Sequence, residues 1–301
     1  MDQPKPKPCG LLNINKPKGL TSRAVVDRVG KSFLRVKVGH AGTLDPLASG
    51  VLIVFVGAAT RLVEYVQRMP KTYRTVVRLG ARSDTLDANG QIVAEPNPRV
   101  ASEAEARSAL AAQEGAFAQT PPQYSALKVA GQRAYDLARE GRTVDLAART
   151  VSVYRIDLLT YEWPRLEFEV ACSGGTYIRS IARDLGETLG CGGLVEALTR
   201  THIGSFSLAD ALDPQTLTES ELASQLRPAA EAVAQLPRLQ LSVAQRAAVF
   251  QGQPLPANQL AGGDVPAGEV ALFGPEGELV AVAEHDTRTG RIWPRRVLAV
   301  R

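Results

Sequence analysis

Two residues with catalytic chemistry, His40 and Asp45, lie in the glycine-punctuated loop 39–50. Pro46 fixes its own φ and restricts Asp45 to extended backbone, so a stiff chain carries the carboxylate. The apolar, β-branched run 51–56 that follows predicts a buried strand. A carboxylate held at the mouth of a sheet can act as a nucleophile or as a proton acceptor. An Asx-type turn that simply leads into a core strand would show the same pattern.

A second group suited to chemistry is Arg179, which follows the glycine pair Gly174 and Gly175. These glycines lead into a predicted helix that ends at about Leu189, before a further run of glycines, and its first turn presents backbone N–H groups beside the guanidinium. A helix N-terminus together with an arginine favours an anion. A corner between a sheet and a helix with no special role would look much the same.

The composition is that of an ordinary globular protein. The 301 residues are 45% hydrophobic and 22% charged, and the net charge of +4 is compatible with nucleic-acid binding without demonstrating it. No apolar run reaches the roughly 20 residues of a membrane span. The Pro- and Lys-rich residues 1–9 are expected to be a disordered tail without secretory character. Three scattered cysteines have neither disulfide nor zinc spacing, so we expect a cytoplasmic protein without a metal.

Periodicity and capping predict the elements that must position these groups. One helix is expected to begin at Thr21 or Ser22. Further helices are expected at residues 60–66, 102–113, 219–226 and 228–235. The expected strands are residues 10–15, 51–56, 71–80, 151–159, 166–171, 198–206, 270–273, 279–284 and 292–300. The short strands near the C-terminus suggest a small β-rich module.

A segment rich in basic and aromatic residues lies between the predicted strands, at 124–149. Its cations include Lys128, Arg133, Arg139 and Arg142, and tyrosines are interleaved with them. This composition is typical of a flap that contacts RNA, and a solvated helical hairpin would share it. Few apolar groups anchor the segment, so we expect it to be mobile in the free protein.

Residues 83–90 contain Asp84, Asp87 and the pair Asn89 and Gly90. They lack the spaced acidic ligands and the terminal glutamate of an EF-hand calcium loop. Asn-Gly is a strong hairpin signal. The loop is therefore interpreted as a hairpin turn without a role in a site.

The loop 39–50 reads G-H-x-G-T-L-D-P-L-A-x-G and resembles the motif of the TruB-type tRNA pseudouridine synthases. Five further stretches resemble segments of that family: K-P-x-G-x-T-S at 16–22, K-x-Y-R at 71–74, Y-S-A-L-K at 124–128, S-x-G-T-Y-I-R at 173–179 and L-x-R-x-x-x-G-x-F at 198–206. The resemblance rests on motifs from residue 10 to residue 206 and on position alone in the remainder.

The resemblance implies a role for six residues of a site. Asp45 corresponds to the catalytic nucleophile, and Arg179 to an arginine that pairs with it and would keep it ionised by lowering its pKa. The residues that would bind the substrate are His40, Tyr73, Tyr177 and Leu198. The segment 124–149 corresponds to a thumb that closes over the RNA stem-loop through Lys128, Arg133, Arg139 and Arg142.

The resemblance also implies the fold and the reaction. The fold would be α+β: a mixed-sheet pseudouridine synthase catalytic domain over residues 10–235, with a helical thumb insertion at about 124–149. A small β-rich, PUA-like RNA-binding domain would follow at 238–301, with Arg291, Arg295 and Arg296 on its surface. The enzyme would flip uridine 55 of the tRNA T loop out of its stack and isomerise it to pseudouridine. It would act on the T-arm stem-loop as a monomer, without a cofactor or an obligatory protein partner. It would not be bound to a membrane.

Other functions remain open from the sequence. The loop could serve recognition alone in a non-catalytic RNA-binding protein, or Asp45 could serve a hydrolase that liberates free uracil. The chain could also be a guide-RNA-dependent pseudouridine synthase, although the insertion at 124–149 favours a stand-alone enzyme. The sequence leaves open whether Asp45 attacks C1′ of the ribose or takes the 2′ proton.

Overall fold

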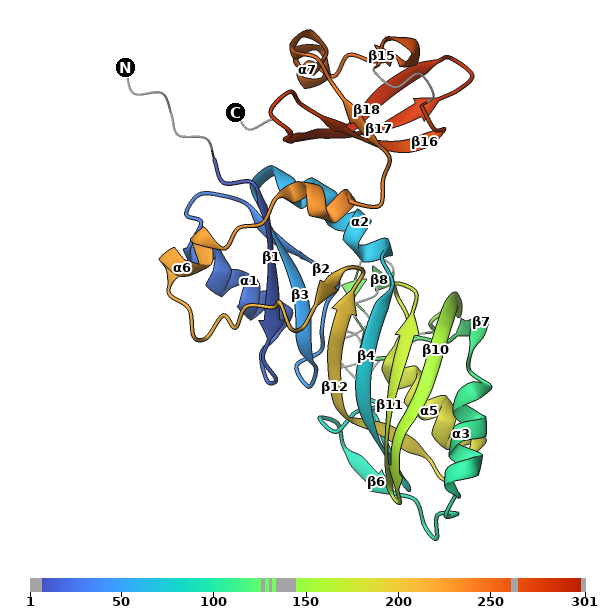
Figure 1. Ribbon diagram of the computed structural model, residues 1–301. Coiled ribbons are helices and arrows are strands. Elements are labelled where there is room, and N and C mark those ends of the chain that lie inside the picture. Colours follow the sequence, from blue (N-terminus) through green and yellow to red (C-terminus); the bar gives the residue numbers. More distant parts are fainter. Residues whose placement is uncertain (1–6, 126–127, 130–131, 134–144, 261–264, 299–301) are drawn as a thin grey trace.

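The computed structural model describes residues 7–125, 128–129, 132–133, 145–260 and 265–298. Two β-sheets dominate it, a large one in the lower part of Figure 1 and a smaller one above it. Helix α2, Val63–Arg68, lies between the two sheets. Helices flank both sheets, so the architecture is α+β, as the sequence predicts.

The large sheet is mixed. Its strands follow the order β1-β3-β12-β4-β11-β10-β7, with β2 paired to β3 and β13 to β12. Among these described pairs only β3 and β12 run parallel. The strands are β1 Gly10–Lys16, β2 Val38–Ala41, β3 Ser49–Val56, β4 Lys71–Leu79, β7 Gly115–Gln119, β10 Arg149–Glu162, β11 Arg165–Cys172, β12 Gly193–Ile203 and β13 Phe206–Ser207.

Burial explains the sequence pattern of the strands. β3 is apolar throughout 51–56 because helices cover both of its faces. One face packs against α1 Ser22–Lys31 and α6 Glu219–Ser224. The other packs against η1 Gly57–Leu62, α2 and η2 Ala229–Val233. β4 alternates buried and accessible residues, since only one of its faces meets the core.

Helices α3, Glu103–Ala111, and α5, Ile178–Thr188, cover one face of the other half of the sheet (Figure 1). Ser102 begins α3 with a capping box, and Thr21 caps α1. The opposite face of the sheet carries cross-strand ion pairs, Arg74–Glu167, Arg155–Glu169 and Arg165–Glu196. The core of this half therefore lies on the helix side.

Residues 238–260 and 265–297 form the second sheet and the elements beside it, around an apolar cluster of their own. Its strand order is β14-β16-β17-β18-β15. The elements are β14 Arg238–Gln240, α7 Val243–Phe250, β15 Leu255–Pro256, η3 Ala257–Gln259, β16 Gly268–Phe273, β17 Leu279–Asp286 and β18 Arg291–Val297. Phe273 and Val282 also share a cluster with residues of α2, so this sheet packs against the helices beside the large sheet.

Two small hairpins complete the described chain: β5 Ala81–Ser83 with β6 Ile92–Ala94, and β8 Lys128–Val129 with β9 Gln132–Arg133. The second hairpin lies within the segment 124–149, where the sequence analysis expects a helical thumb, and residues 134–144 of that segment lie outside the described residues. No helix in the described ranges is long and apolar enough to cross a membrane.

Candidate active site

Asp45 lies in the turn between β2 and β3, and the start of α1 holds this turn in place. The hydroxyl of Ser22 accepts from the Leu44 N–H at 2.9 Å and donates to the Leu44 carbonyl at 3.1 Å. The Gly19 N–H donates to the Pro46 carbonyl at 2.7 Å. The residues on both sides of Asp45 are thereby fixed, so the segment 16–22 positions the carboxylate.

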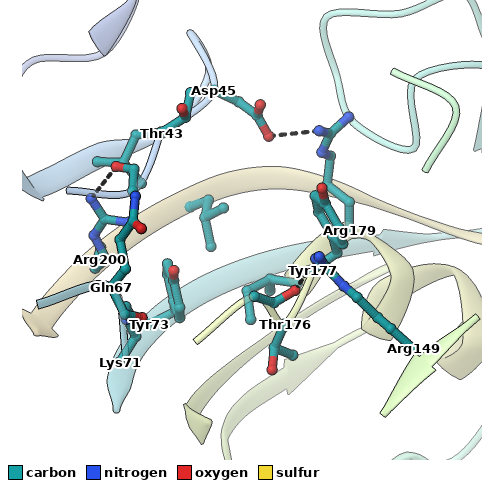
Figure 2. A pocket seen from close by; sticks show the side chains of 15 residues that line it. Thr43, Asp45, Gln67, Lys71, Tyr73, Arg149, Thr176, Tyr177, Arg179 and Arg200 are labelled. Carbon is teal, nitrogen blue, oxygen red and sulfur yellow. Dashed lines mark hydrogen bonds and ion pairs between the residues drawn. The ribbon is translucent and has the colours of Figure 1, made fainter. Parts of the chain in front are cut away.

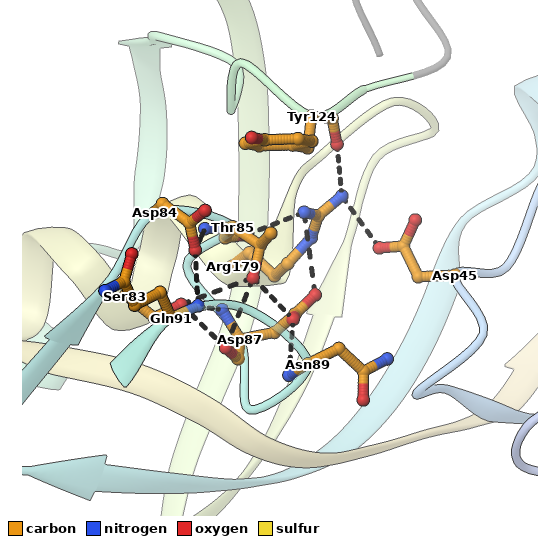
Figure 3. A network of polar contacts seen from close by, with 9 residues as sticks. All are labelled: Asp45, Ser83, Asp84, Thr85, Asp87, Asn89, Gln91, Tyr124 and Arg179. Carbon is orange, nitrogen blue, oxygen red and sulfur yellow. Dashed lines mark hydrogen bonds and ion pairs between the residues drawn. The ribbon is translucent and has the colours of Figure 1, made fainter. Parts of the chain in front are cut away.

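The Asp45 carboxylate is paired with the buried guanidinium of Arg179 (Figure 3). Nη2 of Arg179 lies 2.8 Å from Oδ2 of Asp45, and this is the pairing expected from the sequence. Nη1 of the same guanidinium lies 3.6 Å from Oδ2 of Asp87. Nη1 also donates to the Thr85 carbonyl and Nη2 to the Tyr124 carbonyl, each at 2.8 Å. Four partners therefore set the orientation of Arg179, whose exposure is 4%.

Burial raises the pKa of Asp45 above its ordinary value, although Arg179 opposes this shift; Asp87 adds to it. Arg179 lowers the pKa of Asp45 as expected from the sequence, but burial outweighs this effect, so the pKa is raised on balance. The reason is that desolvation of the carboxylate favours its protonated form more strongly than the ion pair with Arg179 favours its ionised form. A carboxylate with a raised pKa is a stronger proton acceptor than a free aspartate.

Asp87 is a site residue that the sequence analysis missed. The loop 83–90 does join β5 to β6, as the hairpin interpretation requires. It also brings a second carboxylate, 4% exposed, to Arg179 (Figure 3). Oδ1 of Asp87 accepts from the Thr85 hydroxyl at 2.8 Å and from the Asn89 N–H at 3.0 Å. The turn thus fixes one oxygen of Asp87 and leaves the other for the guanidinium.

A cavity of about 410 Å³ opens beside Asp45 and Arg179 (Figure 2). Tyr73 from β4, Tyr177 from the start of α5 and Leu198 from β12 line it. The structure therefore brings these three predicted residues to the same space as the ion pair. The volume lies in the range of small-molecule sites, about 300–1,000 Å³, and aromatic walls suit a planar base.

Two buried cations, Lys71 and Arg200, also line the cavity, and the sequence analysis assigned neither of them to the site. Arg200 donates from Nε to the Val51 carbonyl at 2.7 Å and from Nη2 to the Gly42 carbonyl at 3.2 Å. Burial lowers the pKa of Lys71 to about 8. The Lys71 ammonium donates to the carbonyls of Val66, Gln67 and Met69. Both cations hold backbone of the cavity wall.

The remaining predicted residues lie elsewhere. His40 is half-buried on β2, and the described residues that line the cavity do not include it. Lys128 and Arg133 belong to β8 and β9, whereas Arg139 and Arg142 lie outside the described residues. Their contacts with RNA stay predictions. Within the described part of the chain, no three His, Cys, Asp or Glu residues are grouped to hold a metal ion.

Comparison with known sequences identifies relatives over the whole chain. The family model for the N-terminal domain of TruB family pseudouridylate synthases matches residues 31–178, and that for the C-terminal domain of tRNA pseudouridylate synthase B matches residues 179–239. A tRNA pseudouridine synthase B of Cereibacter sphaeroides is 43% identical over 96% of this chain and 95% of its own. One from Dehalococcoides mccartyi is 38% identical over 92% of this chain and 93% of its own.

Solved structures share the architecture. A Cbf5–Nop10–Gar1 complex contains a chain that matches with a TM-score of 0.75 and 27% identity, over 96% of this chain and 85% of that one. An H/ACA RNP bound to a substrate RNA containing 2′-deoxyuridine gives a TM-score of 0.73 and 26% identity at the same coverage. The mixed-sheet fold expected from the sequence is thus also the fold of these structures.

Proposed function

The chain belongs to the TruB family of pseudouridylate synthases, and we propose that it isomerises uridine 55 in the T loop of tRNA to pseudouridine. The observation that carries the proposal is the Asp45–Arg179 pair at the edge of a cavity lined by Tyr73, Tyr177 and Leu198. The relatives named tRNA pseudouridine synthase B support tRNA as the substrate.

Asp45 is the reacting carboxylate in this proposal. The reaction breaks the N1–C1′ bond of uridine, turns the uracil and joins C5 to C1′. Arg179 holds Oδ2 of Asp45, and the carboxylate, 38% exposed, is open to a substrate. Its raised pKa suits either of two roles, attack on C1′ or removal of the 2′ proton.

The cavity walls hold the detached uracil while it turns. Tyr73 and Tyr177 offer aromatic faces for stacking, and Leu198 offers an apolar contact. Burial raises the pKa of Tyr73, so its phenol stays neutral while the ring stacks on the base. These bond changes need no cofactor.

The rest of the chain binds the RNA in this proposal. The basic segment 124–149 lies over the T arm, and the second sheet serves as a PUA-like RNA-binding domain. His40 contacts the substrate loop beside the flipped base. The enzyme acts as a cytoplasmic monomer without a protein partner.

A guide-RNA-dependent synthase is the alternative, because similar solved structures include an H/ACA RNP and a Cbf5–Nop10–Gar1 complex. Identity supports the stand-alone enzyme: it is 43% to a tRNA pseudouridine synthase B and 27% to the Cbf5-complex chain. The two alternatives differ in whether the purified chain acts alone.

The test is an assay of the purified chain on unmodified tRNA that carries tritium at C5 of uridine. Isomerisation releases tritium to water, a hydrolase liberates free uracil instead, and a binding protein does neither. We expect tritium release without any guide RNA or second protein. Binding of the tRNA without tritium release would contradict the proposal.

A further inference from the structure

Gln119 and Arg149 face each other across β7 and β10, Gln119 before the basic segment 124–149 and Arg149 at its last position. Their side chains do not project from the sheet into solvent. Both reach Tyr177, the residue immediately before α5. Two residues further on, α5 carries Arg179, the partner of Asp45. The pair thus touches the element that bears the ion pair of the site.

Gln119 holds the backbone of Tyr177. Its carboxamide is 1% exposed, accepts from the Tyr177 N–H at 2.8 Å and donates to the Tyr177 carbonyl at 3.1 Å. Tyr177 is the N-cap residue of α5, and its side chain forms no capping hydrogen bond. The Gln119 carboxamide oxygen thus supplies an acceptor for a backbone N–H that has no partner within the helix. The Ser180 hydroxyl adds a bond to the Thr120 carbonyl at 2.9 Å. The first turn of α5 is therefore tied to the end of β7.

Arg149 holds the ring of Tyr177 from the other side (Figure 2). Its guanidinium carbon lies 4.6 Å from the ring centroid, and Nη2 donates to the Gly175 carbonyl. Stacking of an arginine on a tyrosine fixes the plane of the ring. Gly175 has a φ of +91°, so the turn that Arg149 binds is one that glycine adopts readily.

We infer that Gln119 and Arg149 are positioning residues for the isomerisation, acting through Tyr177 and the first turn of α5. Gln119 sets the backbone from which Arg179 reaches Asp45, and Arg149 sets the face that Tyr177 presents to the base. Gln119 itself touches none of the reacting atoms. The inference rests on the proposed function.

The first test replaces Gln119 by methionine, which has a similar shape but forms neither bond. The rate of tritium release in a single turnover should fall by between tenfold and about a hundredfold, because small misplacements of reacting groups cost this much. The Kd for tRNA should stay within about threefold, since the change leaves the RNA contacts in place. Gln113→Met is the matched control: Gln113 also donates to a backbone carbonyl of α5, that of Ile181 at 3.4 Å, but further along the helix.

The second test is a double-mutant cycle between Arg149→Met and Tyr177→Leu. If Arg149 acts through the ring, its replacement costs rate in the wild-type chain but little in the Tyr177→Leu background. A loss that persists in that background, with a weaker Kd and a smaller dependence on salt, would show that Arg149 binds a phosphate instead and overturn its half of the inference. Arg155→Met, a change on the same strand at an exposed ion pair, controls for charge.

These outcomes separate the inference from the function on which it rests. A wild-type chain that released no tritium would overturn both. An active wild type with an equally fast Gln119→Met variant would overturn the inference alone. So would a Gln119→Met variant that loses rate only in proportion to lost folded protein, measured by thermal unfolding of the same samples.

Discussion

At the Asp45 carboxylate, burial and charge act in opposite directions. Burial favours the protonated form, and the guanidinium of Arg179 favours the ionised form. The net result is a carboxylate that is more basic than usual yet held at a fixed place by a 2.8 Å ion pair. Basicity and a fixed place are what a nucleophile for C1′ or a base for the 2′ proton needs.

Asp45→Asn should abolish turnover and leave tRNA binding within roughly tenfold, about 1.4 kcal/mol. The amide keeps the size of the side chain but has no charge to attack C1′ or accept a proton. The measurements are tritium release and the Kd for tRNA, with mass spectrometry to exclude deamidation back to aspartate. Substantial turnover in a variant shown to be intact would remove Asp45 from its role.

Asp87→Asn should move the acidic limb of the pH–rate profile to lower pH. Asp45 must be ionised to react, and the charge of Asp87 is one of the causes that raise its pKa. Removing that charge lowers the pKa of Asp45, so the ionised form persists to lower pH. The rate on the plateau should also fall by about tenfold or more, because Arg179 loses one of its four partners.

The control for Asp87 is Asp84→Asn in the same loop. Asp84 accepts backbone N–H bonds from Thr85 and Gln91 and shows no ion pair to Arg179 among the described contacts. Its replacement should lower stability and leave the pH limb unmoved. Equal shifts of the limb in both variants would mean that the loop, not the Asp87 charge, sets the pKa of Asp45.

The residues of the site were predictable from the sequence to different degrees. Asp45 and Arg179 stand in motifs of fixed spacing, and the structure pairs them. Asp87 was not predictable, because the loop that carries it has a complete local explanation as a hairpin. Arg200 was missed for a related reason: its bonds go to the carbonyls of Val51 and Gly42, and strand pairing that is distant in sequence creates that contact.

At the scale of elements, α5 lies close against β12 because it carries a glycine at the contact. A Cβ built on Gly186 would lie 2.2 Å from the backbone nitrogen of Gly193 and 2.3 Å from the carbonyl carbon of Gly192. These neighbours are backbone atoms and have no side-chain freedom with which to move aside. The position of α5, and with it that of Arg179, therefore depends on this contact.

Gly186→Ala should destabilise the protein, although alanine normally stabilises a helix by about 1 kcal/mol relative to glycine. The clash with β12 should cost about 1–3 kcal/mol, as overpacking of a core does. Urea denaturation should therefore show a lower midpoint. Gly30→Ala in α1 is the control, since a Cβ there meets nothing within 4 Å, and its midpoint should rise. A rise in both variants would refute the close contact.

Elements with a single periodicity were predictable, and those shaped by distant contacts were less so. The run 51–56 predicts a buried strand, and both faces of β3 are indeed covered. The segment 124–149 is different, because its composition suits an RNA-contacting flap or a solvated helical hairpin alike and indicates no strand, whereas 128–129 and 132–133 pair as β8 and β9. Helix α7 was missed as well, since in a short helix only Val249 is buried and the apolar pattern is weak.

At the scale of the whole molecule, α2 joins the second sheet to the wall of the cavity. Its Tyr65 hydroxyl donates to Glu269 at 3.0 Å, and Glu64 accepts from Arg296 of β18 at 2.8 Å. The C-terminal end of α2 is bonded to Lys71, which lines the cavity. Arg296 is exposed, as expected from the sequence, and its guanidinium pairs with Glu64 of the neighbouring helix.

The arginines of the second sheet should therefore differ in their effect on tRNA binding. Arg291 is exposed and makes no ion pair within the described residues, whereas Arg296 is neutralised by Glu64. If the sheet binds phosphate, Arg291→Ala should weaken tRNA binding and reduce the slope of log Kd against log salt by about 1. Arg296→Ala should leave that slope unchanged. A guanidinium that is paired with Glu64 does not neutralise a phosphate, so it releases no counterion from the RNA. The Arg296→Ala substitution should instead loosen the packing of the sheet on α2, seen as faster proteolysis between residues 236 and 241. Identical slopes for the wild type and Arg291→Ala would show that RNA does not reach this edge of the sheet.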